Sequence, residues 1–133
     1  MAAAPAYAAT PLAGAVLVRN TTADTAFGIP AHAELLLTAG ASGTKVTEID
    51  LTPGGTIATG GVVVNIYLYN GTTYYLAPNG SVLVPAVTPA AQVPAPTIQN
   101  SYDNLVLPSG WSLYVTETVA TQPVFVTVFG ASL

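Results

Sequence analysis

Apolar and polar residues alternate along this chain in short runs, and turn-forming residues interrupt them. Such alternation is typical of half-buried strands, because successive side chains of a strand point to opposite faces. In the segment 31–38, for example, Ala33, Leu35 and Leu37 share one face. No window of about 11 residues keeps the spacing of an amphipathic helix without a breaker. The predicted strands are 15–20, 31–38, 44–51, 62–69, 72–77, 81–84, 104–107, 111–119 and 124–129.

Clusters of Gly and Pro separate these runs, and the pair Asn70-Gly71 is the clearest turn signal. Asn-Gly suits the positive φ angles of a type I′ turn, so it predicts a tight hairpin between 62–69 and 72–77. Further turns are predicted at Pro53-Gly54-Gly55, Pro78-Asn79-Gly80 and Pro108-Ser109-Gly110. Short strands at this spacing predict an all-β fold, an antiparallel β-sandwich of about eight strands with a jelly-roll-like arrangement.

Two segments lack the strand pattern. Residues 1–13 are rich in Ala and Pro, and residues 85–97 contain four prolines, which lack the N–H that a strand ladder needs. We expect 85–97 to be an extended crossover and 1–13 to be an extended N-terminal arm, with one β-sandwich domain over 14–133. The start of the chain has no positively charged region, so we expect no secretory signal there.

The composition narrows the class of partner. The 133 residues are 51% hydrophobic and 6% charged, with a net charge of −4 and no cysteine. Arg19 and Lys45 are the only Lys or Arg residues, which excludes a basic stripe for nucleic acid. The apolar content argues against disorder, and every apolar run is shorter than the roughly 20 residues of a membrane-spanning helix. We therefore expect neither nucleic acid nor membrane as a partner.

The candidate catalytic residues form no recognisable motif. His32 has no cysteine partner, and no serine stands in the Gly-x-Ser-x-Gly context of a nucleophile elbow. His32 and Glu34 share a strand face, but two ligands do not complete a metal site. Asp24 and Asp103 are interpreted as turn residues. We predict no catalytic, metal or cofactor site, and a His32 that faces solvent or a subunit interface.

Glu48 and Asp50 also share a strand face, which places their carboxylates roughly 7 Å apart. Paired carboxylates serve glycoside hydrolysis and calcium binding. A glycosidase, however, normally sets its carboxylates on facing strands of an aromatic-lined cleft. We interpret this pair as part of a solvated face or as partners for Lys45.

The aromatic residues leave two interpretations open. Tyr67 and Tyr69 lie on one strand face, Tyr74 and Tyr75 follow across the hairpin, and Trp111 belongs to a later strand. An exposed aromatic patch at Tyr67 and Tyr69 would stack on sugar rings, which predicts carbohydrate binding. Alternatively, cross-strand tyrosine pairs stabilise the hairpin and Trp111 lies in the core, and we favour this interpretation.

The low content of charged residues indicates that the protein works as part of an assembly. Soluble monomers keep a charged surface and protect sheet edges with lysine, whereas obligate interfaces are depleted in charge. The exposed faces of this chain must instead be built from small and neutral polar residues. We infer that much of the surface is covered in the working state, as in an assembled structural protein.

Several turns and strands resemble those of one class of proteins. They are the Gly43-Thr44-Lys45 entry into a strand, the Asn70-Gly71 hairpin, the turn 107–111 (Leu-Pro-Ser-Gly-Trp) and the aromatic-rich C-terminal strand. In this order, over residues 15–130, they resemble small virion proteins of tailed bacteriophages, in particular head decoration (cement) proteins with a β-sandwich fold.

The resemblance implies a structural role without catalysis or cofactor. Decoration proteins of this sort bind the outside of a mature capsid, often as trimers, and clamp neighbouring major capsid subunits together. It therefore implies a homotrimer, the major capsid protein as partner, a location on the capsid surface of the virion, and synthesis in the host cytoplasm. The alternative is a carbohydrate- or surface-binding module of tail, fibre or adhesin type. The residues expected to contact the capsid or a neighbouring copy are Pro5, Tyr7, Pro11 and Leu12.

Overall fold

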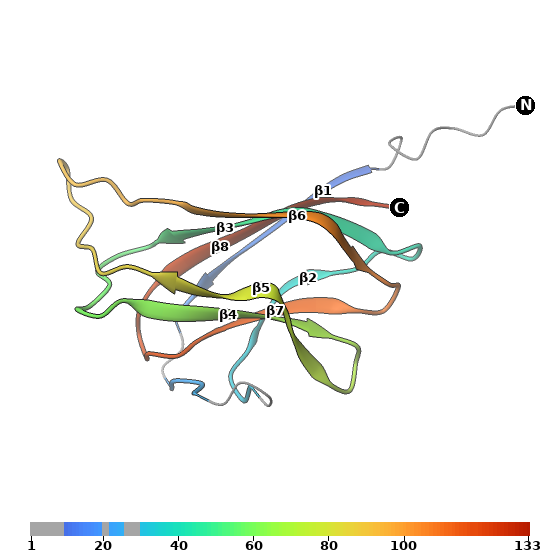
Figure 1. Ribbon diagram of the computed structural model, residues 1–133, viewed down its shortest axis with the longest axis horizontal. Coiled ribbons are helices and arrows are strands. Elements are labelled where there is room, and N and C mark those ends of the chain that lie inside the picture. The colour runs from blue at the N-terminus through green and yellow to red at the C-terminus, as the bar shows by residue number, and fades with distance from the viewer. Residues whose placement is uncertain (1–9, 20–21, 26–29) are drawn as a thin grey trace, which may run out of the picture.

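The computed structural model describes residues 10–19, 22–25 and 30–133, and these form eight β-strands in two layers (Figure 1). All strand pairs are antiparallel, so the predicted all-β sandwich of about eight strands is confirmed. The strands are β1 (Thr10–Val18), β2 (Glu34–Thr38), β3 (Thr44–Pro53), β4 (Val62–Tyr69), β5 (Tyr74–Val84), β6 (Ile98–Leu107), β7 (Ser112–Glu117) and β8 (Val124–Ser132).

The strand order is a nested one. One sheet has the order β1-β8-β3-β6 and the other the order β2-β7-β4-β5. The first strand therefore pairs with the last, the second with the seventh, the third with the sixth and the fourth with the fifth. Such a ribbon of four antiparallel pairs, folded so that alternate pairs enter opposite sheets, is the connectivity of a jelly roll.

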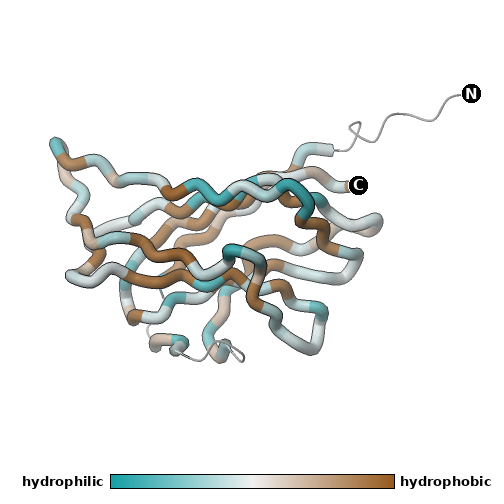
Figure 2. Tube along the Cα trace, in the orientation of Figure 1, coloured by the Kyte–Doolittle hydropathy of each residue, from teal (hydrophilic) through white to brown (hydrophobic). Residues whose placement is uncertain are grey.

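The core lies between the two sheets and follows from the alternation along each strand. In β8, Val124, Val126 and Val128 are fully buried, whereas Phe125 and Phe129 point to the outer face and are exposed. The same alternation along the other strands gives one continuous apolar core. Figure 2 shows apolar positions along the strands of both layers, and mostly paler or hydrophilic residues in the turns.

One side of the sandwich is closed by a close approach of two backbones. A Cβ atom at Gly14 of β1 would lie 2.6 Å from the carbonyl oxygen of Leu36 in β2. Only glycine permits this approach, because any other side chain would push the two edge strands apart. The opposite side is formed by the edge strands β5 and β6, which lie toward the viewer in Figure 1.

The β4–β5 hairpin forms as predicted, but its turn differs. Of the pair Asn70-Gly71 only Gly71 has a positive φ, 97°, so the turn is not of type I′. The side-chain oxygen of Asn70 instead accepts hydrogen bonds from the backbone N–H groups of Thr72 (2.9 Å) and Thr73 (2.7 Å). The Asn70 side chain thus takes the place of a backbone carbonyl in the turn. The loop between β4 and β5 is therefore longer than the predicted two residues.

The turn predicted at Pro78-Asn79-Gly80 is instead a bulge inside β5. Residues 77–80 together face the single residue Ile66 of β4, and Asn79 has a φ of 53°. A Cβ atom at Gly80 would lie 2.7 Å from the carbonyl oxygen of Ile66, so the bulge requires glycine there. Pro78, Asn79 and Gly80 do interrupt the regular pairing, as turn-forming residues should. The strand nevertheless continues beyond them, because Ser81–Val84 also pairs with β4.

The N-terminal boundary also differs from the expectation. β1 begins at Thr10, which pairs with Ser132 of β8. Pro11 and Leu12, which we expected in an extended arm, therefore belong to the sheet. Pro11 is exposed and Leu12 packs against the core. A proline without an N–H is tolerated here because β1 is an edge strand.

The proline-rich segment 85–97 contains no strand, as predicted, although two isolated bridges, Ile57 with Val87 and Ala90 with Val93, stabilise it. It connects β5 in one sheet to β6 in the other and leaves the body of the sandwich in a projecting loop (Figure 1). β6 is longer than the predicted strand 104–107 because it pairs with β3 from Ile98 onward.

Replacing the fully buried Leu51 with alanine should lower the free energy of unfolding by about 2–5 kcal/mol, because it removes apolar contacts and leaves a cavity. Leu83 is exposed, so Leu83→Ala should change the same quantity by less than about 0.5 kcal/mol. Urea unfolding followed by tryptophan fluorescence measures both. Equal effects of the two substitutions would contradict the assignment of the core.

Candidate functional site

Part of the chain between β1 and β2 lies on the outer face of the sheet β2-β7-β4-β5, where Asp24 anchors it. The backbone N–H of Asp24 donates to the carbonyl oxygen of Glu117, at 3.0 Å. The Asp24 carboxylate accepts hydrogen bonds from the N–H groups of Ala31 (3.2 Å) and His32 (2.8 Å). It also accepts one from the Thr116 hydroxyl and contacts Nδ1 of His32, both at 2.8 Å. The Asp24 carboxylate thus ties Ala31 and His32, just before β2, to Thr116 of β7.

The electrostatics of Asp24 favour its charged form. Burial alone would raise the pKa of this carboxyl, whose side chain is only 5% exposed. The hydrogen bonds from His32, Thr116 and Ala31 together outweigh burial and hold the pKa below its ordinary value of 3.8. Asp24 is therefore a buried structural anion, where the sequence indicated only a turn residue.

This aspartate–histidine pair lacks the geometry of a nucleophilic triad. In such a triad the histidine must accept a proton from the attacking hydroxyl. Here the Thr116 hydroxyl donates to Asp24 instead, at 2.8 Å. The arrangement therefore orients a loop, with the Thr116 hydroxyl and the His32 ring both held by the same Asp24 carboxylate.

The same sheet face carries a tyrosine cluster, Tyr67, Tyr69, Tyr74 and Tyr114. The rings of Tyr69 and Tyr74 stack with their centroids 4.2 Å apart. Tyr114 lies edge-on to both, at 5.4 and 5.5 Å, and Tyr67 lies edge-on to Tyr74 at 6.1 Å. Offset stacks and edge-to-face contacts are the favourable aromatic geometries, so these rings hold β5, β4 and β7 together.

The expectation of an exposed patch at Tyr67 and Tyr69 does not hold for Tyr67, whose exposed fraction is 0%. Burial, and to a lesser extent the charge of Asp24, raise the pKa of the Tyr67 phenol. The reason is tertiary: Asp24, which comes from the connection between β1 and β2, lies near Tyr67 on a sheet face that appears open in the sequence pattern. Tyr69 is partly exposed, and its hydroxyl donates to the carbonyl oxygen of Gly71 at 2.9 Å.

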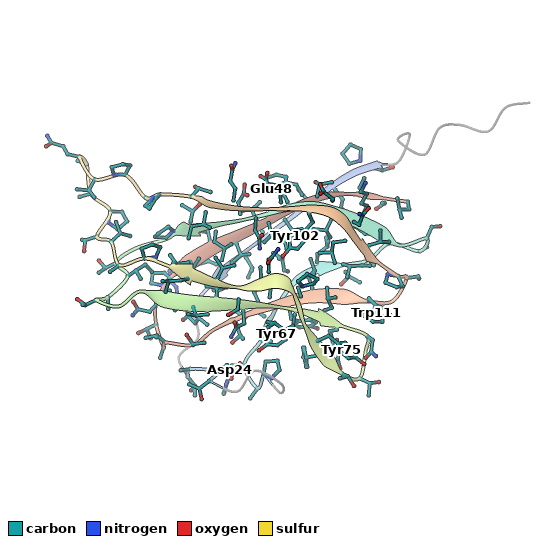
Figure 3. The ribbon with its side chains drawn as sticks, viewed as in Figure 1. Asp24, Glu48, Tyr67, Tyr75, Tyr102 and Trp111 are labelled. Carbon is teal, nitrogen blue, oxygen red and sulfur yellow. The ribbon has the colours of Figure 1, made fainter. Side chains whose placement is uncertain are left out.

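The remaining large aromatic pair closes one end of the core. Tyr75 and Trp111 stack with ring centroids 6.1 Å apart and planes 16° from parallel. Trp111 was expected in the core, and it is instead partly buried and packs against the core from its edge. Figure 3 shows this pair near the end of the sheets, away from Tyr67 and Asp24.

The outer face of the other sheet is apolar along β1 and β8. Ala13, Ala15 and Leu17 of β1 lie beside Phe129, Thr127 and Phe125 of β8 in the ladder, all pointing away from the core. Phe125 and Phe129 are 48% and 42% exposed. We call Ala13, Ala15, Leu17, Phe125 and Phe129 the β1–β8 face. The sequence of residues 124–129, Val-Phe-Val-Thr-Val-Phe, already indicates this face, because large apolar residues occupy both faces of that strand.

The acidic pair borders the β1–β8 face on β3. Glu48 lies opposite Phe129 and Asp50 opposite Thr127. A hydrogen bond with Asp50 raises the pKa of Glu48, and burial and the charge of Asp50 add to this effect. No ion pair joins Lys45 to either carboxylate in the part of the chain that the structure describes. The two acids therefore interact with each other. Figure 3 shows Glu48 on the outer side of its sheet, away from Asp24.

Of the predicted contact residues, Pro5 and Tyr7 lie outside the described residues. Among residues 10–19, 22–25 and 30–133, no group of three or more His, Cys, Asp or Glu side chains could hold a metal ion. No helix in that part of the chain is long and apolar enough to cross a membrane.

No protein-family model matches the chain, and neither curated proteins nor solved structures yielded a match. The features of this chain that bear on function are therefore the residues of its two outer sheet faces.

Asp24→Asn should lower the free energy of unfolding by about 1.5–3 kcal/mol at pH 7, the scale of a hydrogen bond to a charged group. Because the folded pKa of Asp24 lies below 3.8, its stabilising contribution is present above that pH and is lost as the pH falls through the folded value. The difference between wild type and variant should therefore shrink in strong acid.

Chemical unfolding of both proteins between pH 7 and pH 2 measures this difference. Glu48→Gln is the matched control on the other sheet, where the folded pKa is raised, so it should cause no loss at pH 7. A difference between wild type and Asp24→Asn that stays constant with pH would show that Asp24 does not act through its charge.

Proposed function

We propose that this chain is a structural virion protein that attaches to the outside of a phage capsid, without catalysis. It stabilises contacts between major capsid subunits as a homotrimer on the capsid surface, after synthesis in the host cytoplasm. The observation that carries the proposal is the uncharged, apolar β1–β8 face on a chain whose surface bears almost no charge.

The distribution of charge supports a covered surface. Of two basic and six acidic residues, Asp24 and Glu117 are buried, Glu34, Glu48 and Asp50 are partly buried, and Arg19, Lys45 and Asp103 are exposed. In contrast, ten large hydrophobic side chains are exposed among the described residues. Protein interfaces are depleted in charge at their centre and enriched in aromatic residues, so this surface has the composition of an interface.

The β1–β8 face supports a flat docking surface. Ala13 and Ala15 keep the β1 side of the face low, and Phe125 and Phe129 of β8 stand beside them as large, partly exposed apolar side chains. A Cβ atom at Gly54, in the turn after β3, would lie 3.0 Å from the Leu17 side chain and 3.1 Å from the Phe125 ring. The Leu17 and Phe125 side chains therefore both pack against Gly54. Aromatic side chains fixed in this way lose little entropy when they bind a partner.

A trimer multiplies such contacts. Each copy of the face binds modestly, but three linked copies bind together with a much higher effective concentration, which makes release slow. A small apolar face on each subunit is thus sufficient for stable attachment to a repeating shell.

The proposal predicts that replacing both Phe125 and Phe129 with serine abolishes cosedimentation with capsids of the encoding phage that lack the chain. Each phenylalanine contributes about 1.5–3 kcal/mol when buried, so attachment should weaken at least a hundredfold. Leu83→Ser, at an exposed position of similar hydrophobicity on β5, is the control and should attach normally. Undiminished attachment of the double variant would refute the assigned face.

The proposal also predicts the solution mass of the purified chain. Light scattering over a range of concentrations should give three chains of 13.4 kDa each. A mass of one chain that persists at high concentration would refute the trimer.

A second candidate function, carbohydrate binding, is favoured by the tyrosine cluster, because Tyr69, Tyr74 and Tyr114 are partly exposed on one sheet face. It predicts saturable glycan binding that Tyr74→Ala removes and that the Phe125/Phe129 double variant retains. A glycan array read with both variants separates the two candidates, and the absence of saturable binding by wild type removes the second.

A further inference from the structure

The chain contains two Asn-Gly pairs, and the fold places them in different surroundings. Asn70-Gly71 lies in the loop between β4 and β5, and Asn79-Gly80 lies in the bulge of β5. An asparagine followed by glycine can lose its side-chain amide without an enzyme, because glycine has no Cβ atom to shield its backbone nitrogen or to restrict its backbone. That nitrogen attacks the side-chain carbonyl carbon of the asparagine. The local structure decides whether the attack is possible in each pair.

The Asn70 side chain is held in a way that favours this attack. Its carbonyl oxygen accepts hydrogen bonds from the backbone N–H groups of Thr72 at 2.9 Å and Thr73 at 2.7 Å. Negative charge develops on such an oxygen when a nucleophile adds to the carbonyl carbon, and paired backbone N–H donors stabilise this charge. The donors are already in place before the reaction, so they need no rearrangement in the transition state.

The loop also leaves room for the product of the attack, a five-membered succinimide ring. Residues 70–73 are all exposed, and a Cβ atom built at Gly71 would have no atom within 4 Å. Gly71 has a φ of 97°, a conformation that glycine adopts readily. The backbone at this position can therefore turn toward the Asn70 side chain without a clash.

The bulge, in contrast, holds the second pair in place. Gly80 is buried, and a Cβ atom there would lie 2.7 Å from the carbonyl oxygen of Ile66 and 2.8 Å from that of Ala77. The carbonyl oxygen of Asn79 accepts a hydrogen bond from the Asn100 side chain at 2.7 Å. A backbone packed in this way cannot turn toward the Asn79 side chain without breaking these contacts.

We propose that Asn70 is a site of spontaneous deamidation in the folded protein, and that the fold protects Asn79. In the first step the Gly71 nitrogen bonds to the side-chain carbonyl carbon of Asn70. The bond from that carbon to the amide nitrogen breaks, and ammonia leaves with the proton of the Gly71 N–H. In the second step water opens the succinimide at one of its two carbonyl carbons, which gives aspartate or isoaspartate at position 70.

The modification adds a negative charge beside the tyrosine cluster. The loop is joined to the cluster because the Tyr69 hydroxyl donates to the carbonyl oxygen of Gly71 at 2.9 Å, and Tyr69 stacks on Tyr74. A carboxylate at position 70 accepts the same two N–H bonds more strongly than the amide does, because it is charged. Isoaspartate instead lengthens the backbone of the loop by one methylene group. The modification thus changes this face of the protein and leaves the β1–β8 face as it is, so the inference does not depend on the proposed function.

Peptide mapping by mass spectrometry on the folded full chain tests the proposal. Samples are held at neutral pH for increasing times and digested with chymotrypsin, and the gain in mass from amide to carboxyl is followed at each Asn-Gly pair. We expect Asn70 to be lost at least about tenfold faster than Asn79, with both aspartate and isoaspartate as products. Equal rates at the two asparagines would overturn the proposal.

The same chain unfolded in urea is the matched control, because both asparagines then precede a glycine in an open chain. The two rates should become similar there, because Asn79 should react at least about tenfold faster than in the folded protein. Asn70 should react no faster in urea than in the folded protein. A clear acceleration of Asn70 in urea would show that the folded loop protects it, which would overturn the proposal.

A pair of variants gives a second readout, the total ammonia released by the folded protein. Asn70→Gln should remove most of the release, because the longer side chain must close a six-membered ring, which forms more slowly. Asn79→Gln should leave the release unchanged. An undiminished release of ammonia from Asn70→Gln would show that the reaction occurs elsewhere and would overturn the assignment of Asn70.

Discussion

The pairing of the last strand, β8, between β1 and β3 is the constraint on which the rest of the structure depends. Its register buries Val124, Val126 and Val128 and turns Phe125 and Phe129 outward. A slip of one residue would exchange the two sets and place both rings in a core sized for valine. The same pairing links the two chain ends in the nested order of the jelly roll. Core and candidate docking face are therefore two sides of one strand.

The nested order also makes the two sides of the sandwich unequal. At Gly14 the backbones of β1 and β2 meet, whereas β5 and β6 are joined through the long segment 85–97 and stay apart. The bulge around Asn79 and the Asn100 side chain fill part of that opening and leave a cavity of about 220 Å³ lined by Pro78, Tyr102, Asn104 and Leu105.

Local pattern predicted most of the strands and the β4–β5 hairpin, because these depend on alternation and turn chemistry. It did not predict features that depend on distant partners. β5 continues past Pro78-Asn79-Gly80 because β4 offers a ladder beyond the bulge. Tyr67 is buried on the sheet face where Asp24 is anchored, and no spacing in the sequence links the two. Strand pairing between chain ends likewise placed Leu12 in a sheet instead of an arm.

The central claim is that the β1–β8 face rests on the outside of a capsid. Cryo-electron microscopy of virions of the encoding phage tests it most directly. The account predicts extra density on the outer shell that fits a trimer of this sandwich, with Phe125 and Phe129 against the major capsid protein. Virions without such density, or a sandwich seated by its tyrosine cluster, would contradict it.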